Sequence, residues 1–274
     1  MQGRWKNTMQ ALSNYSIHEE YENILRNPQN YEGKEIVLMT CPKCNKPILK
    51  RLEDGMEIAM DCDCMIKERT LKKIQKFQKL SIIDRNAGKD VFSNAKTESK
   101  EEQELYEKIQ KYTRGFKIAL EKNCGLLFTG VPGNGKTFLA NCICNSLKQK
   151  GYTVLSFSMS GYLRTIQDSF GKNDMTETNL LSAVRDADLL FIDDLGSEKL
   201  SEEWGKSKLF ALIDERYRAG KPILITTNLS LSVLDETLKF NKVDKITDRI
   251  HEMVRVIPFT WGSKRRKNKK EYWE

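Results

Sequence analysis

Histidine is scarce in this 274-residue sequence: only His18 and His251 are present, which excludes a histidine-rich metal site. Six prolines and 16 glycines are too few for a collagen-like or low-complexity chain. No apolar run reaches the roughly 18 residues that a membrane-spanning helix needs. The amino-terminal residues also lack the apolar core of a secretory signal. We therefore expect a cytoplasmic protein with reduced thiols and no membrane partner.

The composition is that of a folded, basic protein. Hydrophobic residues make up 39% and charged residues 31%, which is too apolar for a fully disordered chain. Lys and Arg number 46 against 38 Asp and Glu, a net charge of +8. A surplus of this size is compatible with binding a polyanion, although many basic proteins bind none.

The patterns divide the chain into an amino-terminal module over residues 1–80, a polar linker over 81–104 and a main domain over 105–274 with a basic tail. Within the first module we expect a polar helix, a hairpin-like stretch with four cysteines, and a basic amphipathic helix, over residues 1–40, 41–64 and 65–80.

The main domain alternates apolar, strand-like runs with helical patterns. Five strands are expected at Gly125–Thr129, Thr153–Ser158, Leu189–Ile192, Ile223–Thr227 and Val254–Phe259. Helices are expected between them over residues 136–149, 160–169, 178–186 and 205–219. Continuous apolar strands separated by helices indicate an α/β fold, with a five-stranded, mainly parallel sheet that is covered on both faces.

One segment matches the phosphate-binding motif G-x-x-x-x-G-K-[ST]. It consists of Gly130, Val131, Pro132, Gly133, Asn134, Gly135, Lys136 and Thr137, followed by Phe138. It lies between a predicted strand and a predicted helix, which is the context that the motif requires. The glycines let backbone N–H groups turn toward phosphate oxygens, and the start of the helix adds its positive dipole end. We expect Lys136 to neutralise the β- and γ-phosphates and Thr137 to ligate Mg²⁺. The alternative is a glycine-rich turn that binds nothing.

Two carboxylates, Asp193 and Asp194, end the apolar run that begins at Leu189. In a parallel sheet they lie at the carboxyl edge, beside the phosphate-binding loop. We expect Asp193 to hold Mg²⁺ through water, and Asp194 to orient or deprotonate the attacking water. Asn228 ends another predicted strand, and it either contacts the γ-phosphate or its water, or caps the following helix.

Four of the seven cysteines form two close pairs, Cys41 with Cys44 and Cys62 with Cys64. C-x₂-C is a common half of a structural zinc site, and C-x-C can supply two further thiolates to the same tetrahedral ion. The alternatives are four unliganded thiols, or a redox pair at Cys41 and Cys44, which would need a thioredoxin-like βαβ context. The remaining cysteines are expected to pack in the core; they are Cys124, Cys142 and Cys144.

The motifs GVPGNGKT, LLFIDDLG, ITTNLS and DRI resemble those of AAA+ ATPases. More narrowly, they resemble bacterial and phage replicative helicase loaders of the DnaC/DnaI type, in the IstB-like ATP-binding branch. The resemblance covers residues 105–274 well and 41–104 more loosely. It implies an AAA+ P-loop domain preceded by a small zinc-binding module of helix and loop.

The resemblance also implies roles for particular residues. Asn228 corresponds to sensor 1, Arg249 of the DRI segment to an arginine finger that acts on a neighbouring subunit's ATP, and Arg265 or Arg266 to sensor 2. From the residues alone, Arg249 is equally an exposed helix residue with Asp248 and Glu252 as available partners. Many AAA+ proteins carry Glu where this chain has Asp194, so we expect slow hydrolysis.

Contact with single-stranded DNA is a further implication of the resemblance, because residues 160–186 are similar to the helical insertion of initiators and loaders. We expect Phe170 and Trp204 to stack on bases, unless both belong to the core. Lys172 and Lys199 are expected to contact phosphates.

These expectations describe an ATPase that uses ATP and Mg²⁺ and contains a structural Zn²⁺. It would bind a hexameric replicative helicase through its amino-terminal module, self-associate in an ATP-dependent ring or spiral, and deliver the helicase onto single-stranded DNA. One alternative is an IstB-like transposition ATPase that assembles on duplex DNA. Another is a nucleotide-switched adaptor that hardly hydrolyses ATP.

Overall fold

The computed structural model describes residues 35–82, 87–168, 176–197, 200–201 and 203–264. The chain divides into two compact units, Met1–Lys72 and Lys73–Glu274. Among the described residues, no helix is both long enough and apolar enough to cross a bilayer.

The first unit contains a three-stranded antiparallel sheet in the order β1-β2-β3. Its strands are β1 (Ile36–Thr40), β2 (Pro47–Arg51) and β3 (Glu57–Ala59). The helix predicted for residues 1–40 is therefore wrong for the last five, because Ile36 and Leu38 alternate into a small core with Ile48. The hairpin-like stretch is confirmed as the β2–β3 pair. The basic helix is confirmed as α3 (Asp63–Leu80).

A five-stranded sheet in the order β5-β6-β7-β4-β8 organises the second unit. All of its strand pairs are parallel. The strands are β4 (Gly125–Gly130), β5 (Val154–Ser158), β6 (Leu189–Asp193), β7 (Ile223–Thr227) and β8 (Val254–Phe259). The predicted parallel sheet is confirmed, and the carboxyl ends of its strands meet at one edge.

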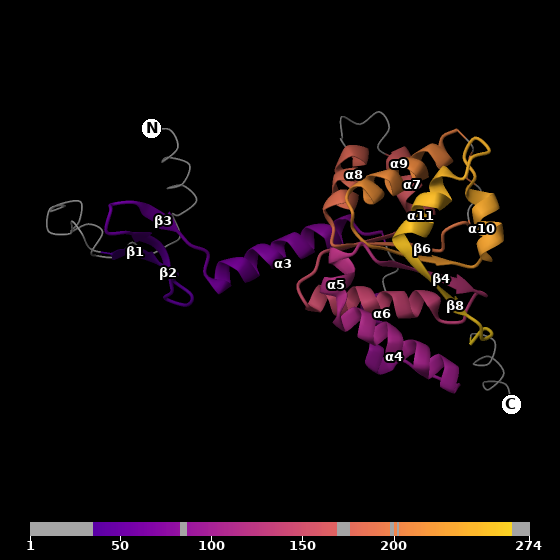
Figure 1. Cartoon of the computed structure of the whole chain (residues 1–274), viewed down its shortest axis with the longest axis horizontal. Coiled ribbons are helices and arrows are strands. Elements are labelled where there is room, and N and C mark those ends of the chain that lie inside the picture. The colour runs from indigo at the N-terminus through magenta and orange to yellow at the C-terminus, as the bar shows by residue number, and fades with distance from the viewer. Residues whose placement is uncertain (1–34, 83–86, 169–175, 198–199, 202, 265–274) are drawn as a thin grey trace. The chain divides into compact units, whose positions relative to one another are not determined.

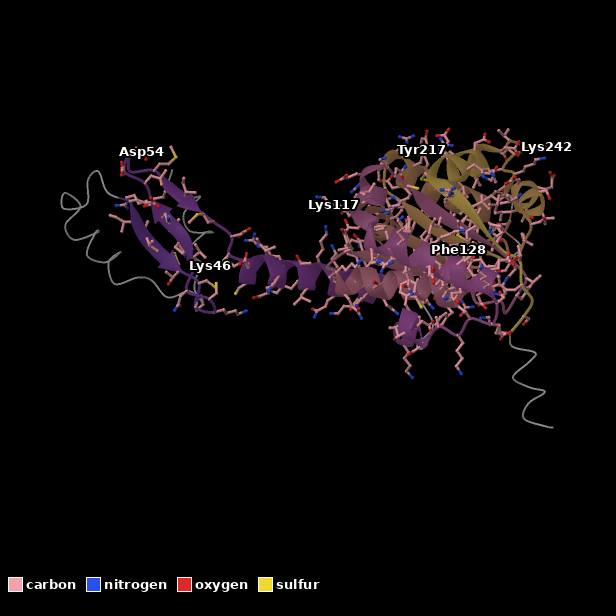
Figure 2. The ribbon with its side chains drawn as sticks, turned by 60° about the horizontal axis from the view of Figure 1, so that its bottom comes forward. Lys46, Asp54, Lys117, Phe128, Tyr217 and Lys242 are labelled. Carbon is pink, nitrogen blue, oxygen red and sulfur yellow. The ribbon has the colours of Figure 1, made fainter. Side chains whose placement is uncertain are left out.

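Helices cover both faces of this sheet (Figure 1). One face carries α4 (Lys100–Arg114), α5 (Phe116–Glu121) and α6 (Lys136–Gln149). The other carries α7 (Met159–Asp168), α8 (Thr176–Asp186), α9 (Gly205–Arg218), α10 (Leu231–Leu238) and α11 (Lys245–Met253). Side chains of the interior strand β4 alternate between the two apolar layers. Phe128, labelled in Figure 2, faces the α6 layer, and Leu127 faces the other.

The described residues of the segment 81–104, expected to be a linker, belong to the second unit and make specific hydrogen bonds within it. The Ile82 N–H donates to the Ser156 carbonyl (2.8 Å) beside the edge strand β5. The short helix η2 (Ala87–Lys89) is held by Asn145 of α6, whose side chain donates to the Ala87 carbonyl (2.7 Å). A second short helix, η3 (Phe92–Asn94), follows. Ile82 thus pairs with the edge strand β5 through a single bridge to Phe157.

Candidate functional site

The phosphate-binding loop connects β4 to α6 at the carboxyl edge of the sheet. Gly133 and Gly135 have φ angles of +82° and +97°. This left-handed region costs other residues conformational energy, so glycine at these positions lets the chain turn sharply into α6. Helix α6 begins at Lys136, which leaves the first N–H groups of the helix at the mouth of the loop.

Lys136 is buried, and its ammonium group lies among neutral oxygens. It donates to the carbonyls of Gly130 (2.8 Å) and Val131 (2.9 Å). It also donates to the side-chain oxygens of Asn228 (2.9 Å) and Asn134 (3.1 Å). A buried cation needs such partners. Phosphate oxygens bind an ammonium more strongly than neutral carbonyls do, so these contacts can be exchanged for an anion.

Asp193 joins three elements at the same edge. Its Oδ1 accepts hydrogen bonds from Thr137 of α6 (2.9 Å) and Thr226 of β7 (2.6 Å). Burial raises the pKa of the Asp193 carboxyl, against the opposing effect of these two hydroxyl donors. A hydroxyl beside a carboxylate is a ligand pair suited to Mg²⁺. Sequence reasoning missed Thr226; the available signal was a hydroxyl residue just before the end of a strand that neighbours β6.

Asp194 has a φ of +55°, which turns the chain sharply after β6. Its backbone N–H donates to Thr226 Oγ1 (2.8 Å), and its carboxylate accepts a hydrogen bond from Asn228 Nδ2 (2.5 Å). Asn228 therefore bridges Lys136 and Asp194. The alternative in which Asn228 caps a helix is wrong, because Ser230 is the N-cap of α10. The structure thus brings together all five residues expected near the phosphates, which are Lys136, Thr137, Asp193, Asp194 and Asn228.

Arg249 lies on α11 and contacts α9. Its Nη2 atom is 2.9 Å from Asp214 Oδ1, and its guanidinium carbon is 4.8 Å from the ring centre of Phe210. The pairing with Asp248 or Glu252 that the sequence offered is replaced by this contact between helices. Arg249 Nε is buried and has no hydrogen-bond acceptor among the described residues.

The paired cysteines form one cluster, in which the four sulfur atoms lie within 4.8 Å of one another. Cys41 and Cys62 are buried, and Cys44 and Cys64 are partly buried. A hydrogen bond from the Lys43 backbone lowers the pKa of Cys41 to about 7, which favours the thiolate. Four converging sulfurs can hold one tetrahedral ion. The sheet around them is antiparallel, which is not the βαβ context that a redox pair needs.

The other cysteines differ from one another. Cys142 and Cys144 are buried in α6, and burial raises the pKa of each to about 12, so both stay protonated packing residues. Cys124 is exposed, and the prediction that it packs in the core is wrong.

Trp204, just before α9, lines a groove of about 310 Å³. Sequence reasoning missed Arg164 and Gln167 of α7, which also line this groove. Phe170, Lys172 and Lys199, expected to contact DNA, and Arg265, expected to be sensor 2, lie outside the described residues.

The parallel sheet, the glycine-rich loop between β4 and α6, and the carboxylates after β6 define a P-loop nucleotide-binding protein of the AAA+ type. The family described as IstB-like ATP binding protein matches residues 67–272. The protein belongs to this family.

Relatives and solved structures agree with this membership. The chain is 29% identical over 182 residues to the replicative helicase loader DnaC of Escherichia coli K12, which covers 66% of this chain and 71% of that protein. The crystal structure of the DnaC helicase loader superposes with a TM-score of 0.56 at 24% identity, over 64% of this chain and 99% of that chain. The crystal structure of DnaI gives 0.55 at 19% identity, over 69% and 98%. The structural likenesses are likenesses of fold.

We predict that Asp193→Asn raises the melting temperature of the nucleotide-free protein by about 2–4 °C at neutral pH. Because burial raises the pKa of Asp193, its ionised form is disfavoured in the folded state. Stability is therefore lost as pH rises above the ordinary value of ~4. Asn cannot ionise, so the gain should vanish below that pH. Thermal unfolding at several pH values measures it.

Asp188→Asn is the matched control at the other end of β6, because Asp188 precedes the strand and Asp193 ends it. Its carboxylate accepts hydrogen bonds from the backbone and hydroxyl of Thr153, both at 2.7 Å. Loss of its charge should lower the melting temperature instead. A destabilised Asp193→Asn protein would show that this carboxylate serves the fold.

Proposed function

We propose that the protein is an ATP-dependent loader that delivers a replicative DNA helicase onto single-stranded DNA. The observation that carries the proposal is the convergence of Lys136, Thr137, Asp193, Asp194 and Asn228 at one sheet edge. Its placement in helicase loading rests on the similarity to proteins named as helicase loaders.

In the proposed mechanism, Lys136 exchanges its carbonyl partners for oxygens of the β- and γ-phosphates. Thr137 and Asp193 would hold Mg²⁺, and the bound ion would neutralise charge on the same phosphates. Asn228, whose side-chain amide donates to Asp194, would also contact the γ-phosphate or the water in front of it. Asp194 orients that water or takes its proton. Its side chain is one methylene shorter than Glu, so slow turnover is expected.

A role for Arg249 across a subunit interface is supported by the accessible part of its side chain, which is 26% exposed. Asp214 shares its carboxylate with Arg218, so it neutralises Arg249 only in part. Phosphate oxygens of a neighbouring subunit can therefore pair with the guanidinium. We propose that subunits assemble with ATP between them and that Arg249 completes the neighbouring site. The sensor 2 role stays with Arg265, which follows Lys264 in sequence.

We assign helicase binding to the first unit and Zn²⁺ to its four cysteines. Among the described residues of this unit, the buried core consists of four apolar residues and two of the thiols, which is a small core. An ion that links Cys41 and Cys44 to Cys62 and Cys64 would stabilise it. The unit also exposes Met56 and Ile66, at 59% and 50%, and exposed apolar side chains are typical of protein interaction surfaces.

DNA contact is assigned to the groove beside Trp204. Trp204, which is partly buried against the core, and Arg164 both line this groove. They would supply a stacking surface for a base and a cation for a phosphate. The second candidate, a transposition ATPase on duplex DNA, is favoured only by the IstB-like description of the family.

The proposed function predicts ATP-dependent capture of a hexameric replicative helicase. A pull-down with Mg-ATP should retain the helicase and not a transposase. Lys136→Ala should lose Mg-ATP binding because the loop loses its ammonium, whereas Asp194→Asn should bind Mg-ATP but hydrolyse it slowly. Retention of a transposase on duplex DNA would support the second candidate. Binding with no turnover, with or without single-stranded DNA, would support the adaptor.

The cysteine cluster predicts one zinc per chain by elemental analysis. Cys64→Ser should lose the ion, because a tetrahedral site then keeps only three thiolates, and should lose helicase capture while keeping Mg-ATP binding. Cys124→Ser changes an exposed thiol outside the cluster and should keep one zinc. Purified protein with far less than one zinc per chain contradicts the assignment.

If Arg249 acts on the ATP of a neighbouring subunit, two inactive variants should restore one another's ATPase activity when they are mixed. Arg249→Ala should bind Mg-ATP normally but hydrolyse it slowly, since a finger acts on the transition state. Mixed with Lys136→Ala, some interfaces regain an intact loop facing an intact finger, and activity should partly return. Arg218→Ala is the control: it also pairs with Asp214 (2.8 Å) but stays active. Co-assembly without restored activity would refute the role.

A further inference from the structure

The segment Thr260–Lys264, called the strap here, follows β8 and lies against the phosphate-binding loop. The Lys264 backbone N–H donates to the Gly133 carbonyl (2.9 Å). The Trp261 indole N–H donates to the Asn134 carbonyl (2.8 Å). Two successive carbonyls of the loop are therefore bonded from the carboxyl-terminal side of the sheet.

The strap is anchored at its other side to the first turn of α4. The Thr260 hydroxyl donates to Glu101 (2.8 Å). The Lys264 ammonium pairs with Glu102, whose side chain is only 2% exposed. Glu102 also accepts a hydrogen bond from the Glu98 backbone (2.8 Å), which fixes the start of the helix. These contacts hold the strap on a buried, paired carboxylate.

The geometry of the peptide bond turns this contact into a constraint on the site. In a trans peptide the C=O and the next residue's N–H point in opposite directions. A Gly133 carbonyl bonded to the strap therefore turns the Asn134 N–H away from the strap. In the same way, the Asn134 carbonyl bonded to Trp261 turns the Gly135 N–H away. These two N–H groups belong to the loop that cradles the α- and β-phosphates.

Asn134 carries the same constraint to the cation of the site. Its side chain is fully buried and donates to the Phe259 carbonyl (3.3 Å), and its oxygen accepts a hydrogen bond from Lys136 (3.1 Å). The end of β8 and the strap thus fix both the backbone and the side chain of one loop residue.

We propose that Trp261 is a positioning residue for the nucleotide site, which keeps the loop N–H groups turned toward the phosphates before the ligand arrives. The proposal rests on the proposed function, because it requires that Mg-ATP bind at this loop. A preorganised loop loses less conformational freedom on binding, so loss of the indole donor should weaken affinity.

Trp261→Phe removes the N–H but keeps an aromatic ring against Phe259, whose ring centre is 4.9 Å away. Calorimetric titration should show affinity for Mg-ATP lowered about 3- to 10-fold, the scale of one hydrogen bond. Mg-ADP should lose the same factor, because it carries both phosphates that the loop contacts. Trp5→Phe makes the same chemical change near the other end of the chain and should bind as the parent does.

Steady-state kinetics separate positioning from simple loss of fold. In Trp261→Phe the KM for ATP should rise by the same factor, with kcat within about twofold, because the indole N–H donates to Asn134 and the hydrogen bonds of Asp193 and Asp194 come from other residues. A merely structural role would lower kcat through a smaller active fraction and leave KM unchanged. Lys264→Met, which releases the strap from Glu102, should raise KM in the same direction and serves if Trp261→Phe does not fold.

Unchanged affinity in both variants would overturn the proposal, and so would weaker ATP binding with normal ADP binding. A parent protein that fails to bind Mg-ATP would instead contradict the proposed function, so the two failures are distinguishable.

Discussion

The buried ammonium group of Lys136 is the interaction on which the arrangement of the site depends. A cation away from water must be surrounded by oxygens, and four lie within 3.1 Å. They come from the end of β4, from the loop and from the end of β7. The parallel sheet makes this possible, because it brings the ends of strands that are far apart in sequence to one edge. The four oxygens that accept these hydrogen bonds are neutral, so a phosphate oxygen would bind the lysine more strongly than they do.

A second buried cation closes the opposite edge of the sheet and shows what a purely structural site looks like. Arg216 is fully buried and donates only to backbone carbonyls, including those of Ala187 (2.7 Å) and Pro222 (2.5 Å). Burial lowers the pKa of Arg216 to about 9, still well above neutrality. It joins the end of α8 to the starts of β6 and β7. Among the described residues, its hydrogen-bond acceptors are all backbone carbonyls, whereas Lys136 also donates to the side-chain amides of Asn134 and Asn228.

Sequence patterns predicted the parts of the fold that local chemistry decides. The five strands and α6 could be predicted from apolar runs, glycines and the helix period. The phosphate-binding loop and the carboxylates Asp193 and Asp194 could be predicted from the spacing of their motifs. Contacts between segments that are far apart in sequence could not be predicted from these patterns. Thr226 beside Asp193, Asp214 beside Arg249 and Trp261 beside Asn134 are each set by tertiary packing. Strand β1 was assigned to a helix because a short apolar run fits either period. The linker looked loose because polar residues such as Asp90 also bind helices, here Asn141 (2.8 Å).

Arg249 is held in place by residues of its own subunit, but its charge is only partly neutralised there. Asp214 divides its two oxygens between Arg218 (2.8 Å) and Arg249 (2.9 Å), so it neutralises each only in part. The ring of Phe210 supports the flat guanidinium and also lies 4.7 Å from the Lys245 ammonium. Stacking fixes the plane of the group without using its hydrogen-bond donors. A guanidinium fixed in this way loses little further freedom when an anion from another subunit approaches its exposed part.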